Sequence, residues 1–229
     1  MLWLKAWLET QWRIVFMLCM GLFVLGLPLE ISRTARSTLM LMGRMDAFLA
    51  LFAAISLAGS GIHTVSTRPG GSEKIGDEST LFTLSLPVTR AWLFVVRTVA
   101  GVLGTAALLT SFAVVTWLFV RPLAVDVHDA LGYLTVILSC SLTVYGMSAL
   151  LSTFCDEGWR YRISAIAVAA PFVLSTGGKL PPAIDIFKPL AVTSPLVTHQ
   201  IPWETVVIAC VLAFLFLGAA LTVIQRRDY

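Results

Sequence analysis

The sequence predicts an all-α integral membrane protein with six transmembrane helices, and two observations lead to this prediction. The 229 residues are 58% apolar and only 13% charged, whereas a soluble domain contains about 25% charged residues. The apolar residues also gather in long runs. A run of about 20 apolar residues is what a helix needs to cross a hydrocarbon layer about 30 Å thick.

Six apolar runs can be counted along the chain, and together they predict a six-span domain over residues 14–229. The expected spans cover residues 14–29, 41–62, 91–120, 130–154, 163–176 and 205–224. The first and fifth runs are short, with Pro28 at the edge of the first and Pro171 inside the fifth. Because proline removes a helical hydrogen bond, we expect kinked or broken helices there.

The basic residues indicate how the chain is oriented. An even number of spans places both ends on one side, and Lys and Arg are enriched on the cytoplasmic side. If both ends are cytoplasmic, the inner segments hold Lys5, Arg13, Arg68, Lys74, Arg90, Arg160, Arg162, Arg226 and Arg227, and the outer segments hold Arg33, Arg36, Arg121, Lys179 and Lys188. This distribution favours a multi-pass protein of the inner (plasma) membrane with both termini in the cytoplasm.

Residues 1–13 are predicted to form an amphipathic helix on the membrane surface. Lys5, Glu9 and Arg13 recur every four residues and form one charged stripe, while tryptophan and leucine cover the remaining surface. Such a helix lies at the level of the lipid headgroups. The alternative is that these residues simply extend the first span.

The segment between the second and third spans is predicted to contain a short helix over residues 77–86. Asp77 and Glu78 suit a helix N-terminus, and Pro87 ends the helix. An apolar surface is supplied by Leu81, Phe82, Leu84 and Leu86. Thr89 is then expected to cap the start of the third span, so that this segment joins the span through a sharp turn.

The last outer segment, residues 179–202, is predicted to be a re-entrant element. Its five prolines are Pro181, Pro182, Pro189, Pro195 and Pro202, yet much of the segment is apolar. Partial insertion at the outer membrane interface suits this composition better than a free polar loop does.

No catalytic, cofactor or metal set is recognisable, so we expect no enzyme activity in this chain. Gly178 and Lys179 are the nearest approach to a phosphate-binding loop, but Leu180 follows and the earlier glycine is missing. HExxH and GxSxG patterns are absent, and the four cysteines show no CxxC spacing. The three histidines, His63, His128 and His199, are interpreted as boundary residues at the ends of spans. A net charge of only +3, with scattered basic residues, argues against nucleic-acid binding.

Two features allow more than one interpretation. Arg44 and Asp46 either lie in the outer headgroup region, which we favour if the second span starts near Ala47, or line a path for substrate. Small residues in the third and fifth spans let helices approach closely in lipid. They serve packing within the bundle or a contact between subunits, and for the fifth span we favour the contact.

Several features together resemble the membrane subunits of ABC-2 type transporters, also called type V ABC exporters. They are the N-terminal WLETQWR, the six spans, LFTLSLPVTR at residues 81–90, and QRRDY at the end of the chain. The resemblance covers the whole chain in order. The charged stretch EISRTARS between the first two spans departs from this pattern, so the outer ends of these two spans stay undetermined.

The resemblance implies a permease subunit that works with a separate cytoplasmic ABC ATPase, which would hold ATP and Mg. The short inner helix would be the coupling helix that docks on this ATPase, with contacts from Asp77, Glu78, Leu81, Phe82, Leu84, Leu86, Pro87 and Arg90. A second contact would come from Asp156, Glu157, Trp159 and Arg160. A second permease copy, or a similar permease, would complete the pathway.

The apolar interior favours a cargo that is amphipathic, lipid-like or a peptide, moved across or out of the membrane lipids. The alternative function is a scaffold or sensor in the membrane. Such a protein would bind a cytoplasmic partner through the same inner segment without transporting a solute.

Overall fold

The computed structural model of the chain describes residues 11–21, 35–58, 89–120, 126–155, 157–179, 185–191 and 195–226. These residues form helices and short connections, and no β-strand occurs among them. Residues 11–21 form a helix. The labelled helices are α3 (Ala35–Leu57), α5 (Arg90–Val120), α6 (Val127–Leu151), α7 (Glu157–Thr176), α8 (Lys188–Ala191), α9 (Pro195–Thr198) and α10 (Trp203–Arg226). The prediction of an all-helical protein is therefore confirmed.

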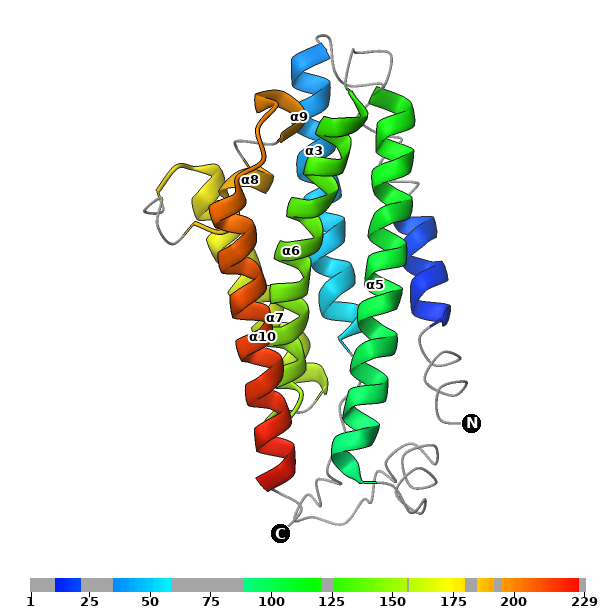
Figure 1. The fold of residues 1–229 in the computed structure, drawn as a ribbon, viewed down its shortest axis with the longest axis vertical. Helices are drawn as coiled ribbons and strands as arrows, with labels where there is room; N and C mark the ends of the chain where they lie inside the picture. The colour runs from blue at the N-terminus through cyan, green and yellow to red at the C-terminus, as the bar shows by residue number, and fades with distance from the viewer. Residues whose placement is uncertain are drawn as a thin grey trace.

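Successive long helices run in opposite directions (Figure 1). We call the end of the bundle where α5 begins and α10 ends the lower end, and the opposite end the upper end. The helix over residues 11–21 runs from lower to upper, because Arg13 contacts the end of α3 and Gly21 lies against Phe112 in the upper half of α5. Including this helix, the chain alternates in direction in the way that consecutive spans require.

Among the described residues, three helices are long and apolar enough to cross a membrane. They cover Ala91–Leu118 in α5, Val127–Leu151 in α6 and Trp203–Arg226 in α10, and they coincide with the predicted third, fourth and sixth spans. The predicted second and fifth spans fall on α3 and α7, each of which begins six residues earlier than expected. A count of apolar residues marks only the apolar stretch, whereas backbone hydrogen bonding carries a helix on into its polar flanks.

The predicted boundary between the interfacial helix and the first span is not visible as a break. The helix over residues 11–21 passes through positions 13 and 14 without interruption. The rest of the predicted interfacial helix, residues 1–10, and the end of the first span lie outside the described residues. The interfacial position of residues 1–13 and the alternative, in which they extend the first span, therefore both stay predictions.

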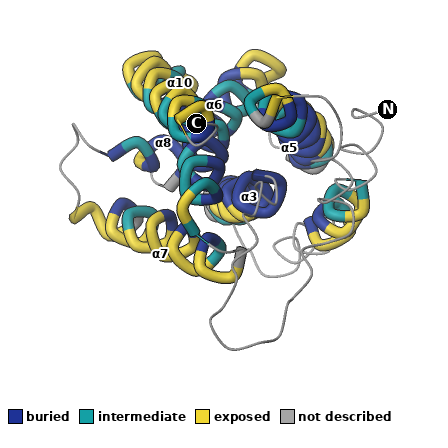
Figure 2. Tube along the Cα trace, turned by 90° about the horizontal axis from the view of Figure 1, so that it is seen from below, coloured by how far each residue is buried: buried dark blue, intermediate teal, exposed yellow. Residues whose placement is uncertain are grey.

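The centre of the bundle is α3 (Figure 2). Its small side chains Ala47, Ala50, Ala53 and Ala54 are completely buried. Small residues let neighbouring helices approach closely, and in lipid this close packing is a main source of helix association. By contrast α10 exposes large apolar side chains such as Phe214 and Leu215. An unbroken apolar outer surface of this kind suits contact with lipid.

Two neighbouring helices, α6 and α10, show how closely the backbones approach. The hydroxyl group of Thr143 in α6 donates a hydrogen bond of 2.7 Å to the carbonyl oxygen of Ala209 in α10. One turn further along, a Cβ atom added at Gly146 would lie 3.0 Å from the carbonyl oxygen of Ala213. Glycine at this position therefore allows the two helices to touch.

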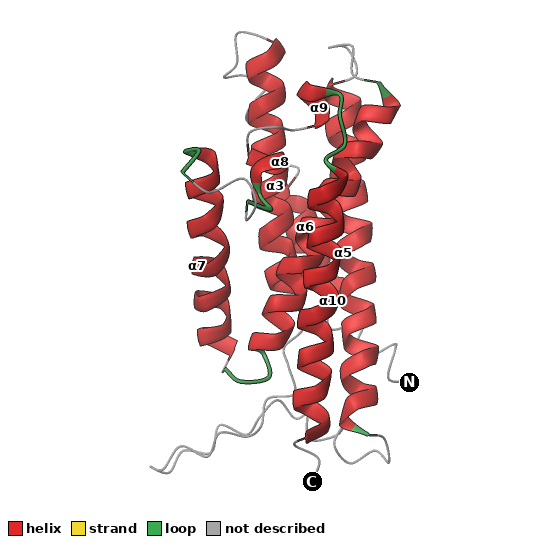
Figure 3. Ribbon diagram, turned by 60° about the vertical axis from the view of Figure 1, so that its left-hand side comes forward, coloured by secondary structure: helices red, strands yellow, loops and turns green. Residues whose placement is uncertain are grey.

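The fifth predicted span, α7, stands away from the other long helices (Figure 3). It continues through Pro171 as one helix and ends at Thr176. Gly178, in the turn that follows, has a φ of 65°, which is suited to glycine. Ser164 and Val168 are buried, but Ile166 and Val173 are exposed. Much of its surface thus has no cover from the described part of the chain.

The proline-rich segment before α10 folds against the bundle. The thiol of Cys140, near the midpoint of α6, donates a hydrogen bond of 3.3 Å to the carbonyl oxygen of Ile186. The ring of Phe187 meets Phe172 of α7 edge-on, with 6.3 Å between the ring centroids. The short helices α8 and α9 also bury Leu190 and Leu196. Packing against α6 and α7 is thus established, and the re-entrant position in a membrane stays a prediction.

Candidate functional site

Three successive carbonyl groups at the end of α3 meet three different elements. The carbonyl oxygen of Ser56 accepts a hydrogen bond of 3.0 Å from Nη1 of Arg13, in the N-terminal helix. The carbonyl oxygen of Ala58 accepts one from Nη1 of Arg160, in α7. Between them, the carbonyl oxygen of Leu57 lies only 2.9 Å from the position of a Cβ atom added at Gly101, in α5. We call these five residues with Leu57 the α3 junction.

Helix geometry explains why arginine is found in the α3 junction. The last four carbonyl groups of a helix lack donors within the helix, and the helix dipole makes this end negative. Ser56, Leu57 and Ala58 are all buried, so water cannot serve these groups freely. A cation at a helix C-terminus contributes about 0.3–1 kcal/mol, and up to about 2 kcal/mol when partly buried.

Tyr161 joins the two arginines of the α3 junction. Its hydroxyl group accepts a hydrogen bond of 3.4 Å from Nη1 of Arg13. The guanidinium group of Arg160 lies 4.4 Å from the centroid of the Tyr161 ring, a distance at which cation–π attraction operates. One aromatic side chain therefore helps to position both cations.

The first turn of α5 is capped as the sequence predicts. The backbone N–H of Trp92 donates a hydrogen bond of 3.3 Å to the hydroxyl oxygen of Thr89, and the N–H of Leu93 donates one of 3.1 Å to its carbonyl oxygen. From this cap α5 continues without a break for 31 residues, which corresponds to about 46 Å. Residues 59–88 thus connect the α3 junction to a capped, continuous helix.

The residues predicted to bind a partner are described only in part. Asp77, Glu78, Leu81, Phe82, Leu84, Leu86 and Pro87 lie outside the described residues, as does Asp156. Arg90 and Glu157 are the first residues of α5 and α7, and nothing is described of their side chains. Trp159 is 60% exposed, and the guanidinium group of Arg162 lies 5.4 Å from its ring centroid.

Arg160 does not belong to the second contact surface that was predicted together with Asp156, Glu157 and Trp159. Its side chain is 1% exposed and is directed into the bundle, where it binds the end of α3. The sequence prediction counted it as a surface residue of a charged loop. The buried carbonyl groups of α3 supply a partner that the sequence did not reveal.

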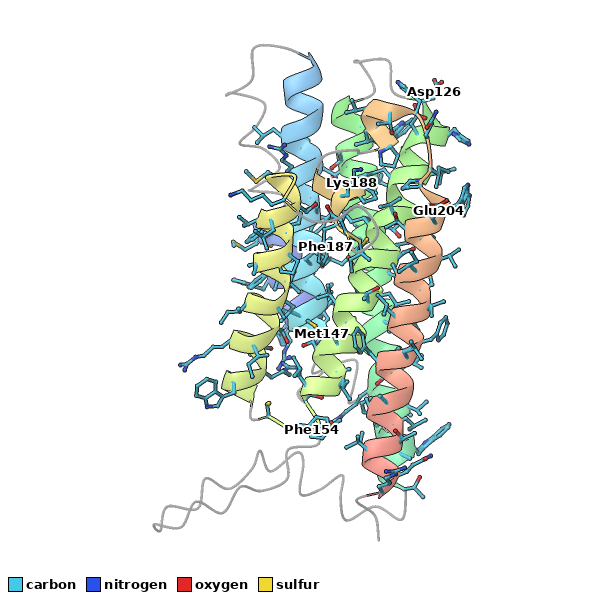
Figure 4. The ribbon with its side chains drawn as sticks, turned by 90° about the vertical axis from the view of Figure 1, so that its left-hand side faces the viewer. Asp126, Met147, Phe154, Phe187, Lys188 and Glu204 are labelled. Carbon is cyan, nitrogen blue, oxygen red and sulfur yellow. The ribbon has the colours of Figure 1, made fainter. Side chains whose placement is uncertain are left out.

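The charges that the structure describes are distributed unevenly between the two ends. By their positions along the helices, the described basic side chains toward the lower end are Arg13, Arg97, Arg160, Arg162 and Arg226. The other described basic side chains, Arg44, Lys179 and Lys188, lie away from that end, as do the described acidic side chains Asp46, Asp126, Asp129, Asp185 and Glu204. Figure 4 shows Asp126 near the upper end, Glu204 in the upper half and Phe154 near the lower end. Among the described side chains, the lower end is therefore basic.

Asp46 lies in a polar contact within the upper half of the bundle. Its side chain is completely buried, and Oδ2 accepts a hydrogen bond of 2.6 Å from the hydroxyl group of Thr116 in α5. Nearby, the hydroxyl group of Tyr133 donates a bond of 2.9 Å to the carbonyl oxygen of Gly43. We favoured a headgroup position for both Arg44 and Asp46. Arg44 is exposed, but Asp46 is enclosed by protein. Its contact with Thr116 joins two distant parts of the chain and cannot be recognised from one sequence.

Two of the histidines meet at one carboxylate. Nδ1 of His199 lies 2.5 Å from Oδ2 of Asp129, and Nδ1 of His128 lies 3.9 Å from Oδ1 of the same residue. His199 follows α9, whereas Asp129 lies in the first turn of α6, so this contact joins segments 70 residues apart. The described part of the chain contains no group of three acidic, histidine or cysteine side chains that could hold a metal ion.

No family model, curated protein or solved structure matches this chain. The resemblance to ABC-2 type permeases therefore depends on the sequence features given above.

Proposed function

We propose that this chain is the permease subunit of an ATP-driven exporter whose ATPase is a separate cytoplasmic subunit. The single observation that best supports the proposal is the capped start of α5. Thr89 closes the first turn, and the helix then runs unbroken through Ala91–Leu118, one of the three stretches able to cross a membrane. A stiff helix directly after a docking segment is what the transfer of force from a partner requires.

In this proposal the lower end of the bundle faces the cytoplasm. The basic side chains described there agree with the enrichment of Lys and Arg on that side. Exposed tryptophans also occur toward both ends, with Trp159 at the start of α7 and Trp203 at the start of α10. Indole rings are enriched at both membrane interfaces. The alternating helix directions suit six spans with both termini in the cytoplasm.

The remaining parts of the proposal concern the pathway. The segment that carries α8 and α9 would be re-entrant from the outer side, since Ile186 reaches the middle of α6. The exposed side of α7, with Ile166 and Val173, would contact a second permease copy or a similar permease. The cargo would be amphipathic, lipid-like or a peptide.

The mechanism would be a change between two states of the membrane dimer. ATP and Mg²⁺, held by the partner subunits, would favour one arrangement of those subunits. Residues 77–86, docked on them, would carry the displacement to the permease. The nucleotide shifts the equilibrium only by its difference in affinity for the two states.

Substitutions in the docking segment test this proposal. Leu84→Asp and Phe82→Asp each replace an apolar anchor by a charge without a partner, which costs several kcal/mol at a buried interface. Both variants should insert in the membrane but lose co-purification with the proposed ATPase subunit, to be sought in the neighbouring reading frames, and lose stimulation of its activity. Thr83→Asp is the matched control, because a helix over residues 77–86 would place Thr83 about 100° away from each of these two positions.

Two outcomes would contradict the proposal. If both variants retain normal co-purification and stimulation, residues 77–86 do not dock on the ATPase. If an ATPase binds through these residues but its activity never responds to the permease or to cargo, the chain is a scaffold or sensor.

A further inference from the structure

The α3 junction has a feature that helix capping alone does not require. Its two arginines come from opposite parts of the chain, 43 residues before Ser56 in one case and 102 residues after Ala58 in the other. Each donates to a different carbonyl group of the same last turn. The end of α3 is thereby fixed to the N-terminal helix and to α7 at once, while Gly101 brings it against α5.

The position of the α3 junction in the chain is the second observation. Ala58 is the last described residue before residues 59–88, and Thr89 begins the capped α5 directly after them. Any displacement of this connecting segment therefore acts on two helix ends. A displacement that reaches α5 moves a single continuous helix. A displacement that reaches α3 moves a turn that is hydrogen-bonded to the N-terminal helix and to α7.

The contacts of α7 extend the connection. The hydroxyl group of Ser164, one turn after Arg160, lies 3.3 Å from that of Ser148 in α6. Further along α7, Phe172 packs on Phe187 in the segment that precedes α8. A shift of α3 would therefore displace Arg160 and with it α7. Through α7 the shift would reach α6 and the segment that carries α8.

We propose that Arg13 and Arg160 are positioning residues that make the end of α3 a transmission point, through which movement of residues 59–88 reaches the N-terminal helix and α7. This inference rests on the proposed function, because it assigns the route by which the partner's displacement spreads. The side chain of Arg160 is buried, so a docked partner would act on it through the permease and not by direct contact. Arginine suits the role because its planar guanidinium group presents several donors in a fixed geometry, whereas lysine offers a single mobile ammonium group.

The test compares Arg160→Ala with Arg162→Ala. Both residues lie in the first turns of α7, but Arg162 is exposed and stacks only on Trp159 among the contacts described for it. Hydrogen exchange of the purified full-length chain in detergent reports on the last turn of α3. We expect exchange at residues 55–58 to rise about tenfold in Arg160→Ala, since a cation and a donor are lost from a buried helix end. Arg162→Ala should leave it unchanged.

The second readout is the partner ATPase. Arg160→Ala should co-purify with it at the wild-type level, because the docking residues are intact, but should lose most of the stimulation. Arg160→Lys should recover part of it. If Arg160→Ala does not fold, Tyr161→Phe provides the second variant. It removes the hydroxyl group that accepts from Arg13 and keeps the aromatic ring, and it should give a smaller change of the same kind in both readouts.

The outcomes separate the two proposals. Unchanged exchange in Arg160→Ala and Tyr161→Phe overturns the α3 junction as a fixed point, whatever the ATPase does. Raised exchange with normal stimulation overturns its role in transmission and leaves the permease proposal intact. A wild-type chain that neither binds nor stimulates the ATPase overturns the proposed function, and the transmission role with it.

Discussion

The hydroxyl group of Thr116 in α5 donates a hydrogen bond to the carboxylate of Asp46 in α3, at an oxygen–oxygen distance of 2.6 Å. Both side chains are buried, so the bond joins the two helices inside the bundle. A buried carboxylate depends on its donors, because the energy of leaving water must be compensated. The contact therefore holds α3 against α5 in the upper half of the bundle, above the α3 junction.

Thr116→Val is expected to destabilise the protein by about 1–3 kcal/mol, since it leaves Oδ2 of Asp46 buried without its donor. Thermal unfolding in detergent measures the effect. Thr110→Val is the matched control, because the Thr110 hydroxyl group is exposed and donates to Ala106 in its own helix. Equal stability of the two variants would show that the contact between α3 and α5 contributes nothing.

Gly101→Ala is expected to destabilise the protein by about 1–3 kcal/mol through overpacking. The added Cβ atom would lie 2.2 Å from the hydroxyl oxygen of Tyr145 and 2.9 Å from the backbone oxygen of Leu57. Because the second atom belongs to the backbone, a rotation of Tyr145 cannot relieve the whole clash. Tyr145→Phe should rescue the variant only in part.

Gly218→Ala provides the control for this substitution. No atom lies within 4 Å of a Cβ atom added there, and Gly218 is inside α10, so alanine should be neutral or stabilise by up to about 1 kcal/mol. A Gly101→Ala variant as stable as Gly218→Ala would mean that α3 and α5 are further apart than their contacts indicate.

Thr89→Ala is expected to weaken the first turn of α5 by about 1 kcal/mol, because the N–H of Trp92 loses its side-chain acceptor. Hydrogen exchange at residues 91–93 is the measurement, and it should rise about fivefold while exchange in the middle of α5 stays constant. Thr89→Ser keeps the hydroxyl group and should behave as the wild type. Faster exchange in Thr89→Ser as well would assign the effect to the lost methyl group, not to the cap.

The sequence predicted the features that depend on neighbouring residues. Apolar runs located α5, α6 and α10 within three residues at each end, and Thr89 was recognised as a cap because capping is local. The contacts of Arg160 and Asp46 could not be predicted in this way. Each is decided by a group from a distant part of the chain, and a single sequence does not state which distant backbone oxygen or hydroxyl group a buried charge will meet.

The contact between His199 and Asp129 is expected to contribute to the free energy of unfolding. Asp129 is 8% exposed as a side chain and lies 2.5 Å from the His199 ring, and His199 adopts a φ of 54°, in the left-handed region. The His199 side chain is 63% exposed, so solvent screens the contact. His199→Gly removes the imidazole and at the same time relieves the backbone, and we expect a net loss of about 0.5–1.5 kcal/mol. His199→Ala should cost a further 1 kcal/mol or so, because alanine carries a Cβ atom into the left-handed conformation.

Thermal unfolding measures these two variants and two others, His199→Asn and His128→Ala. His199→Asn should be the least harmful substitution at this position, since asparagine tolerates the left-handed region and its amide can donate to the carboxylate. His128→Ala is the control, because this ring is 78% exposed and lies 3.9 Å from Asp129, where an ion pair contributes under about 1 kcal/mol. If His199→Gly proves as stable as His128→Ala, the short contact does not hold the segment after α9 against α6, and packing such as that of the buried Leu196 retains it instead.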